Sequence, residues 1–553
     1  MPLSSFKPLA LVLSSLGLVY AATNSSLPIV DLGYRLQQAS SYNVTGGFYN
    51  FSNIRYAAPP IGNLRFAPPQ TPTANRSEVH NGNIGRVCPQ ATPSWYNTAG
   101  VFVTDILLSK AFNPSSSIPT PTATPAPDPR ISEDCLFLDV FVPRQVFESA
   151  GLGYGAPVLV WIYGGGYTLG EKASYNPAGL LSASGNVSNG EIIYVAMNYR
   201  LGGFGWLSGP SFQAEGGAAN AGLLDQRFAL EWVQQYIGLF GGDKNRVTII
   251  GESAGGGSVM HQITAYGGSR GPVPFQQAIS QSPGFLPLGS NYGQEQIYNQ
   301  VLQLNNCTNL EELRQVPTAL LIQSNLVQIG QASYGEFVYG PVVDGDFAPL
   351  LAGQLLAQGR FDKSLRVMVG HNADEGLAFT SPYVQTEDLF EEYFRTSFPA
   401  VSAATVYYLT QQLYPPVFDG TYGYVNETQR TNLALSDLAF TCNTFYLDTA
   451  FANRTYSYLF SIAPALHGQD VPYTYYTGGP PSSSVANTTV AVAMQDYITS
   501  FVKTGQPSAE GMPAFHMYGP NATILDLNYT SISHMVDDTA NQRCVWWQKA
   551  LYF

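Results

Sequence analysis

The sequence predicts an α/β fold in which helices flank a mostly parallel central sheet. Two observations support this prediction. An apolar, β-branched run at 247–250 leads directly into the Gly-x-Ser-x-Gly segment 251–255, where a strand would turn sharply into a helix. A second apolar run at 158–162 leads into three consecutive glycines at 164–166. In both places a predicted strand leads directly into a candidate reactive segment, the serine in one case and the glycines in the other. We therefore expect the reactive groups to lie just after strands.

Ser253, at the centre of the first segment, occupies the position of a nucleophile elbow. Such a turn forces the serine backbone into a strained conformation, and Gly251 and Gly255 lack the Cβ atoms that would clash there. The hydroxyl is thereby exposed above the sheet. Because the chain contains 54 glycines, the five-residue pattern also arises by chance, and the partners of the serine decide its role.

A serine nucleophile needs a base to take its proton and a carboxylate to hold that base. Among six histidines, His80 precedes the elbow and His261 lies almost next to it, whereas the expected chain order is serine, acid, histidine. His467 is the favoured base, because it lies beside a glycine and after the strand-like run 456–460. The remaining histidines are interpreted as a loop residue at the end of a strand, His371, and as surface residues, His516 and His534.

Many further segments resemble the type-B carboxylesterase/lipase family, which includes fungal secreted lipases and the cholinesterases. Besides the elbow, the matching segments are 55–60 with 64–66, 132–136, 161–167, 198–201, 220–227, 240–243, 374–376 and 467–468. The resemblance extends over roughly residues 27 to 550. It implies an α/β-hydrolase fold with long insertions, and we expect one domain over residues 22–553 because no linker separates the elbow from His467.

The resemblance also assigns the acid of the triad to Glu375, which follows the apolar run 367–369, and leaves Asp374 as the rival. The implied donors for the charge on the carbonyl oxygen are the N–H groups of Gly165, Gly166 and Ala254. Each such donor contributes about 10²–10³ in rate.

Supporting roles are implied for Glu252 and Ser282, which match positions that hydrogen-bond around the buried side of the site. The implied structural ion pairs are Arg65 with Glu133 and Arg200 with Asp225. The three glycines of the strip, 164–166, should also leave room for a branched alcohol, and a methyl group at Gly164 is expected to intrude on that alcohol.

Five cysteines in an oxidising compartment indicate two disulfides and one free thiol. The resemblance implies the pair Cys88–Cys135, which closes a loop over the active-site mouth. It also implies Cys442–Cys544, which ties the C-terminal helix to the body. Cys307 is expected to be the free thiol.

The reason for a free Cys307 is that Glu312 stands where many relatives carry the partner cysteine. Within the loop over the mouth, the largely apolar stretch 95–112 precedes a stretch rich in proline, serine and threonine at 114–129. Two interpretations stay open for the loop, a mobile flap and a static cover.

The N-terminus predicts secretion, because Lys7 and an apolar stretch at 8–19 precede small residues that suit cleavage after Ala21. Residues 1–21 are therefore interpreted as a signal peptide. No later run is long enough for a membrane anchor. Eleven Asn-x-Ser/Thr sequons suggest glycosylation: Asn24, Asn43, Asn50, Asn75, Asn186, Asn306, Asn426, Asn453, Asn487, Asn521 and Asn528.

These features predict a secreted serine hydrolase that acts on small-molecule or lipid esters with an apolar acyl group and uses no cofactor or metal. Interfacial lipase or sterol esterase activity at a lipid–water interface is the alternative. A non-catalytic adhesion protein is a rival of another class, disfavoured by the retained Ser253, Glu375 and His467. A net charge of −13 repels polyanions, so nucleic acid is excluded as a partner.

Overall fold

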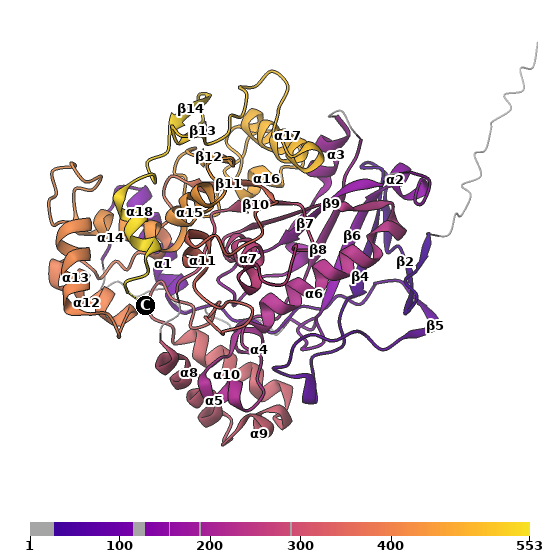
Figure 1. Ribbon diagram of the computed structural model, residues 1–553, viewed down its shortest axis with the longest axis horizontal. Coiled ribbons are helices and arrows are strands. Elements are labelled where there is room, and N and C mark those ends of the chain that lie inside the picture. The colour runs from indigo at the N-terminus through magenta and orange to yellow at the C-terminus, as the bar shows by residue number, and fades with distance from the viewer. Residues whose placement is uncertain (1–26, 114–127, 154, 187–189, 288–289, 553) are drawn as a thin grey trace, which may run out of the picture.

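The computed structural model describes residues 27–113, 128–153, 155–186, 190–287 and 290–552. The predicted signal peptide and residues 114–127 of the proline-rich stretch lie outside these ranges. An 11-stranded sheet forms the centre of the described molecule, with helices on both faces (Figure 1). The seven neighbouring strands β8, β7, β9, β10, β11, β12 and β13 are parallel to one another. The strands at both edges of the sheet pair antiparallel. The predicted α/β fold with a mostly parallel sheet is confirmed.

In spatial order the strands of this sheet are β14 (Ile532–Val536), β13 (Thr523–Leu527), β12 (Tyr456–Phe460), β11 (Arg366–Asn372), β10 (Gln277–Gln281), β9 (Gly242–Glu252), β7 (Ala156–Ile162), β8 (Ile193–Met197), β6 (Phe137–Pro143), β4 (Phe48–Arg55) and β3 (Ser41–Asn43). A smaller sheet contains β1 (Ile29–Asp31), β2 (Arg35–Gln38) and β5 (Asn75–His80). In the central strands β7, β8 and β10 every residue is buried. Parallel strands covered on both faces read as continuous apolar runs for this reason, and the two runs used above belong to β7 and β9.

The helices are α1 (Trp95–Leu107), α2 (Arg144–Glu148), α3 (Ala178–Asn186), α4 (Gly202–Trp206), α5 (Pro210–Ala214), α6 (Ala221–Tyr236), α7 (Ala254–Ile263), α8 (Asn291–Leu304), α9 (Leu310–Gln315), α10 (Thr318–Gly330), α11 (Ala352–Ala357), α12 (Glu387–Ser397), α13 (Ala403–Tyr408), α14 (Glu427–Ser436), α15 (Cys442–Ala450), α16 (Val471–Thr474), α17 (Thr488–Thr504) and α18 (Gln542–Gln548). Shorter turns are η1 (Gly62–Leu64), η2 (Lys172–Ser174), η3 (Ile237–Phe240), η4 (Ala265–Gly268), η5 (Leu377–Phe379), η6 (Leu409–Leu413) and η7 (Asp437–Thr441). Helices α17 and α3 pack together on one face of the sheet, and α6 and α7 cover the other (Figure 1). The groups α8–α10 and α12–α14 extend beyond the sheet as insertions (Figure 1).

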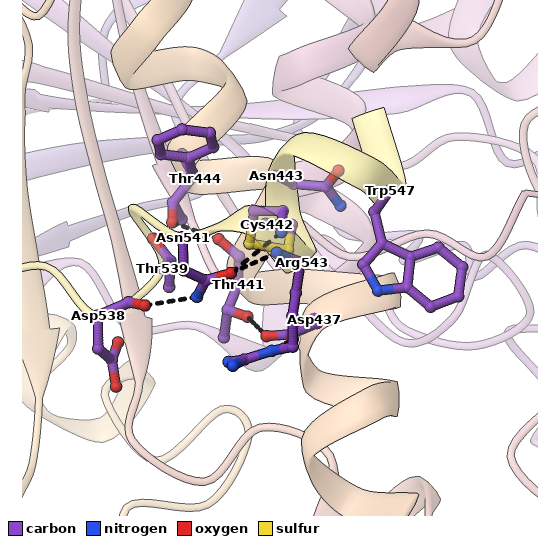
Figure 2. Close-up of a disulfide and its surroundings, with 12 residues drawn as sticks. Asp437, Thr441, Cys442, Asn443, Thr444, Asp538, Thr539, Asn541, Arg543 and Trp547 are labelled. Atoms are coloured by element: carbon purple, nitrogen blue, oxygen red, sulfur yellow. Dashed lines mark hydrogen bonds and ion pairs between the residues drawn. A yellow bond between two sulfur atoms is a disulfide. The ribbon is translucent and has the colours of Figure 1, made fainter. Parts of the chain in front are cut away.

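A disulfide between Cys442 and Cys544 joins α15 to the C-terminal helix α18. Figure 2 shows its surroundings, where Arg543 Nε donates to Asp437 Oδ2 at 2.6 Å. The side chain of Asn541 caps α18 by accepting from the backbone N–H groups of Arg543 and Cys544. The C-terminus is thus fastened to η7, the turn that contains Asp437.

The second disulfide, Cys88–Cys135, closes the loop that contains α1. Cys307 is a free thiol, as predicted. At the position of the missing partner, Glu312 Oε2 accepts from the backbone N–H of Thr308 at 2.7 Å, so a hydrogen bond joins the two segments there. Among the described residues, no helix combines the length and apolar character needed to span a bilayer.

Two buried ion pairs brace the loops around the sheet. Arg65 meets Glu133 at 2.6 Å, and Arg200 meets Asp225 at 2.7 Å. All four side chains are buried, and the guanidinium of each pair donates two hydrogen bonds to its carboxylate, so the charges are compensated. These are the pairs that the resemblance implies.

Candidate active site

Ser253 lies at the turn between β9 and α7, with φ 58° and ψ −126°. A non-glycine residue at positive φ is strained, and such strain concentrates at functional sites. The turn is possible because its glycines are in close contact: a Cβ on Gly255 would lie 2.0 Å from the carbonyl oxygen of Ile162. The predicted strand, elbow and helix are therefore present, and the strain falls on the serine.

Ser253 Oγ lies 2.8 Å from His467 Nε2, and His467 Nδ1 lies 2.5 Å from Glu375 Oε2. These three side chains come from different strand ends, because β9, β11 and β12 precede Ser253, Glu375 and His467 along the chain. Carboxyl ends of parallel strands meet at one edge of a sheet, which brings residues more than 200 positions apart together.

Glu375 is held rigidly on its buried side. Its Oε1 accepts from Ser282 Oγ at 2.7 Å and from the backbone N–H of Asn372 at 2.5 Å. Ser282 therefore contacts the carboxylate as the resemblance implies. These bonds leave Oε2 directed at the imidazole, which fixes the tautomer that carries its proton on Nδ1.

The rival carboxylate, Asp374, points elsewhere. Its Oδ1 accepts from Asn432 Nδ2 at 2.7 Å, on helix α14. The structure brings Glu375 and not Asp374 to His467.

The other histidines lie away from this contact. His371 is buried within the last residues of β11, and His261 is buried in α7, whereas His516 and His534 are exposed. His371 thus belongs to the strand itself rather than to the loop after it.

The pKa values of the pair are displaced in opposite directions. Burial acts to raise the pKa of Glu375, but the charge and hydrogen bond of His467, with the bonds from Ser282 and Asn372, hold the pKa below its ordinary value. For His467, burial acts to lower the pKa, and the charge and hydrogen bond of Glu375 with the charge of Glu252 raise the pKa above 6.5. The geometry thus supports a carboxylate paired with a strongly basic imidazole.

Glu252 lies beside the imidazole of His467, and one of the two carboxylate oxygens of Glu252 accepts no hydrogen bond from the described residues. Its Oε1 is 3.6 Å from His467 Nε2 and, among the described residues, has no hydrogen-bond partner. Burial raises the pKa of this carboxyl. The implied supporting role is therefore electrostatic in this geometry, through a short distance to the imidazole.

A third buried carboxylate, Asp470, was not identified from the sequence. Its Oδ2 accepts from Tyr458 Oη at 2.7 Å, and Asn372 Nδ2 lies 3.3 Å both from Asp470 Oδ1 and from Glu375 Oε1. The only signal was its position three residues after His467, and a lone aspartate in a loop gives no reason to expect this contact.

The glycine strip follows β7 and runs against the elbow. Among the described residues, the N–H groups of Gly165 and Gly166 have no hydrogen-bond acceptor, and Ala254 is the first residue of α7, where helical N–H groups lack a partner. All three predicted donors are thus free.

The expectation for Gly164 is wrong. A Cβ on Gly164 would lie 2.6 Å from the carbonyl oxygen of Glu252 and 2.8 Å from Ser253 Cβ. Its methyl group would strike the elbow rather than an alcohol pocket, because the strip and the nucleophile are in direct contact. Gly164 is required for this close approach.

Aromatic side chains that the sequence did not single out surround the base. The Phe440 ring lies 4.3 Å from the His467 ring and that of Phe379 lies 5.2 Å away. Trp95, at the start of α1, contacts Phe379 at 6.0 Å and Phe337 at 5.7 Å between ring centroids. The wall beside the triad is therefore apolar and includes the base of the loop closed by Cys88–Cys135.

The chain is similar to known proteins over most of its length. The model of the carboxylesterase family matches residues 36–547. The carboxylesterase patB of Penicillium expansum is 40% identical over 95% of this chain and 96% of its own length. A secreted lipase of Arthroderma benhamiae is 32% identical over 71% of this chain and 76% of its own length.

Among solved structures, EstA of Aspergillus niger superposes with a TM-score of 0.77 at 27% identity, covering 95% of this chain and 98% of its own. Together with the sheet order, this similarity confirms the α/β-hydrolase fold.

Proposed function

This chain belongs to the carboxylesterase family, and on that premise we propose that it is a secreted serine hydrolase that cleaves esters with an apolar acyl group through an acyl-enzyme. The observation that carries the proposal is the 2.8 Å contact between Ser253 Oγ and His467 Nε2 at a strained elbow. Family membership makes the chain a carboxylic ester hydrolase. The residue roles and the substrate class are the proposed part.

In the first half of the reaction, His467 Nε2 takes the Ser253 proton while Oγ attacks the ester carbonyl carbon. The negative charge on the carbonyl oxygen is received by the N–H groups of Gly165, Gly166 and Ala254. When the tetrahedral intermediate collapses, the bond to the alcohol oxygen breaks and the proton on Nε2 goes to that oxygen. The acyl group remains on Ser253.

In the second half, water takes the place of the alcohol. His467 accepts a proton from water while the water oxygen attacks the acyl carbon. When the carboxylic acid leaves, His467 returns the proton to Ser253 Oγ. Glu375 stays ionised and stabilises the imidazolium in both halves. Nucleophile, base and donors are all side chains and backbone of this chain, so the proposed cycle draws on no metal or cofactor.

The apolar character of the acyl group is proposed from the aromatic wall beside the triad. Phe440 and Phe379 line the side of His467, and Phe337 lies against the glycine strip. Such a wall favours hydrocarbon acyl groups over charged ones because it offers dispersion contacts and excludes water.

A second candidate function is an interfacially activated lipase. It is favoured by α1, whose Leu107 is half exposed and whose neighbour Leu108 is 57% exposed, so that the cover presents apolar surface outward. The relative from Arthroderma benhamiae is named a secreted lipase. An oil–water interface would bind such a surface.

Secretion and glycosylation are proposed on three grounds. Residues 1–21 have the pattern of a signal peptide, and two disulfides fit an oxidising compartment. Among the described residues, five sequon asparagines are exposed: Asn43, Asn75, Asn306, Asn426 and Asn521. Treatment of the secreted protein with peptide N-glycosidase F should lower its apparent mass, and an unchanged mass would contradict glycosylation.

The test of the proposed activity uses p-nitrophenyl esters of increasing acyl length and the variant Ser253→Ala. Loss of the nucleophile is expected to reduce kcat on p-nitrophenyl butyrate by about 10⁶, with an unchanged circular dichroism spectrum. Retained turnover in a folded Ser253→Ala protein would overturn the assignment of the nucleophile. Charged acyl groups preferred over butyrate would overturn the apolar substrate class.

A further inference from the structure

A cavity lies at the opposite edge of the sheet from the triad. Its volume is about 270 Å³, well above the roughly 30 Å³ that one water occupies in the liquid. The lining residues are Lys363, Ser364, Leu365, Arg366, Phe451, Arg454, Tyr456, Gly505, Gln506 and Met517. Arg366 and Tyr456 begin β11 and β12, whose other ends lead to Glu375 and His467.

This position separates the cavity from the active site. A strand of seven residues such as β11 rises by about 3.3 Å per residue, so its two ends lie roughly 20 Å apart. A ligand in the cavity would not touch an ester bound at Ser253.

The cavity has an unusual charge for this protein. Three of its lining residues are cations, Lys363, Arg366 and Arg454, although the chain as a whole has a net charge of −13. No carboxylate is among the lining residues. A local excess of positive charge is needed here for an anion to bind, since the overall charge repels anions.

The three cations also lack the carboxylate partner that most arginines of the described chain have. Arg130, Arg430 and many others form ion pairs with carboxylates, whereas no ion pair is found for Lys363, Arg366 or Arg454 among the described residues. All three side chains are exposed, so their charges are available to a ligand.

Arg366 has a structural role that the other two lack. One of its terminal nitrogens, Nη1, donates to the carbonyl oxygen of Thr504 at the end of α17, where a cation is favoured by the helix dipole. Its remaining N–H donors have no hydrogen-bond partner within the part of the chain that the structure describes. Among the described residues, the charged groups of Lys363 and Arg454 donate no hydrogen bond to the protein, and Lys363 Nζ lies 5.8 Å from the centroid of the Phe361 ring.

Apolar side chains complete the cavity. Phe451 and Tyr456 are more than nine-tenths buried, and Met517 is 47% exposed. A bare inorganic anion would leave this apolar side of the cavity unfilled, whereas a ring or hydrocarbon attached to the anion would pack on it.

We propose that this cavity binds a phosphate or sulfate monoester whose organic part is apolar or ring-shaped. Guanidinium groups match the oxygens of such a group with paired N–H donors, and the lysine ammonium adds a point charge. The anionic group would lie between Lys363 and Arg454, and its organic part would contact Phe451 and Met517.

The test measures binding of phenyl phosphate and inorganic phosphate to the whole secreted protein by isothermal titration calorimetry. Phenyl phosphate is expected to bind saturably and more tightly than inorganic phosphate, and benzyl alcohol, which is neutral, should not bind at the site. Because charge-assisted hydrogen bonds are worth more than neutral ones, Lys363→Gln with Arg454→Gln should weaken binding by about tenfold or more.

Lys244→Gln is the matched control, since Lys244 is an exposed cation on β9 that does not line the cavity. It should leave binding unchanged, and phenyl phosphate should leave KM for p-nitrophenyl butyrate unchanged. Absence of saturable phenyl phosphate binding would overturn the proposal. So would saturable binding that survives the double substitution in a folded protein.

Discussion

The proposed catalytic residues and helix α1 of the loop closed by Cys88–Cys135, which we call the cover, are held in different ways. Glu375 is fully buried and bound by Ser282, Asn372 and His467 through short hydrogen bonds between neighbouring strand ends. Among the described residues, the cover helix α1 is attached by aromatic contacts of Trp95 and Tyr96 and by a hydrogen bond from Trp95 Nε1 to the Glu336 carbonyl oxygen at 2.8 Å.

This difference indicates that the arrangement of the triad and the access of substrate to it depend on different kinds of contact. Buried charged hydrogen bonds are directional, so the triad has one arrangement. Aromatic contacts are less directional and depend on excluding water, so an apolar interface can compete for them. Substitutions in the triad should therefore abolish chemistry, and substitutions in the cover should change which substrates reach it.

The largest effect is expected for His467→Ala. Without the base the serine proton has no acceptor, so kcat on p-nitrophenyl butyrate should fall by about 10⁶. The control is His534→Ala, an exposed histidine on β14, which should keep full activity. Stopped assays with purified, folded protein make the comparison, and a loss below about tenfold for His467→Ala would remove it from the role of base.

A smaller loss is expected for Glu375→Gln. The amide keeps the shape but cannot stabilise an imidazolium, and loss of the acid alone costs about 10⁴ in kcat. Asp374→Asn provides the matched comparison, because Asp374 bonds to Asn432 instead. A silent Glu375→Gln beside an inactive Asp374→Asn would transfer the role to Asp374.

The pH profile sharpens the electrostatic part of the account. The base must be neutral to accept a proton, and Glu375 raises the pKa of His467 above 6.5. In the wild type, kcat/KM should therefore fall tenfold per pH unit below a midpoint above pH 6.5. Glu375→Gln removes the raising charge, so its residual activity should show a midpoint at lower pH. Identical midpoints, or a flat profile down to about pH 4, would contradict this coupling.

The smallest effect is expected in the cover. If an interface favours the open loop, the wild-type rate on tributyrin should rise abruptly above its solubility limit. Trp95→Ala removes the contacts with Phe337 and Phe379 and should reduce this jump a few-fold while sparing dissolved p-nitrophenyl butyrate. Leu152→Ala, at an exposed position outside this loop, serves as the control. A smooth saturation curve through the limit would favour a static cover.

Local patterns in the sequence were sufficient for the elbow and for the fold class. Ser253 follows a β-branched strand and lies between glycines, and this arrangement is set by steric contacts within a few residues. Chain order and a neighbouring glycine favoured His467. Glu375 required resemblance to known proteins, because two adjacent carboxylates are indistinguishable until their side-chain directions are known.

Other parts of the site depend on contacts between distant elements. Phe379 and Phe440 contact the His467 ring from η5 and η7, and no spacing in the sequence relates these segments to His467. The prediction that a methyl group at Gly164 would enter the alcohol pocket was also wrong. A run of glycines indicates that little space is available around the backbone, but not which neighbouring segment occupies that space.

The most direct test of the account is to isolate the acyl-enzyme. The protein is mixed with p-nitrophenyl acetate, quenched with acid within the first turnover and digested for mass spectrometry. The account predicts one acetyl group per chain, located on Ser253, together with a burst of one equivalent of p-nitrophenol and no adduct in Ser253→Ala. Rapid turnover with an unmodified Ser253, or with the acetyl group on another residue, would contradict it.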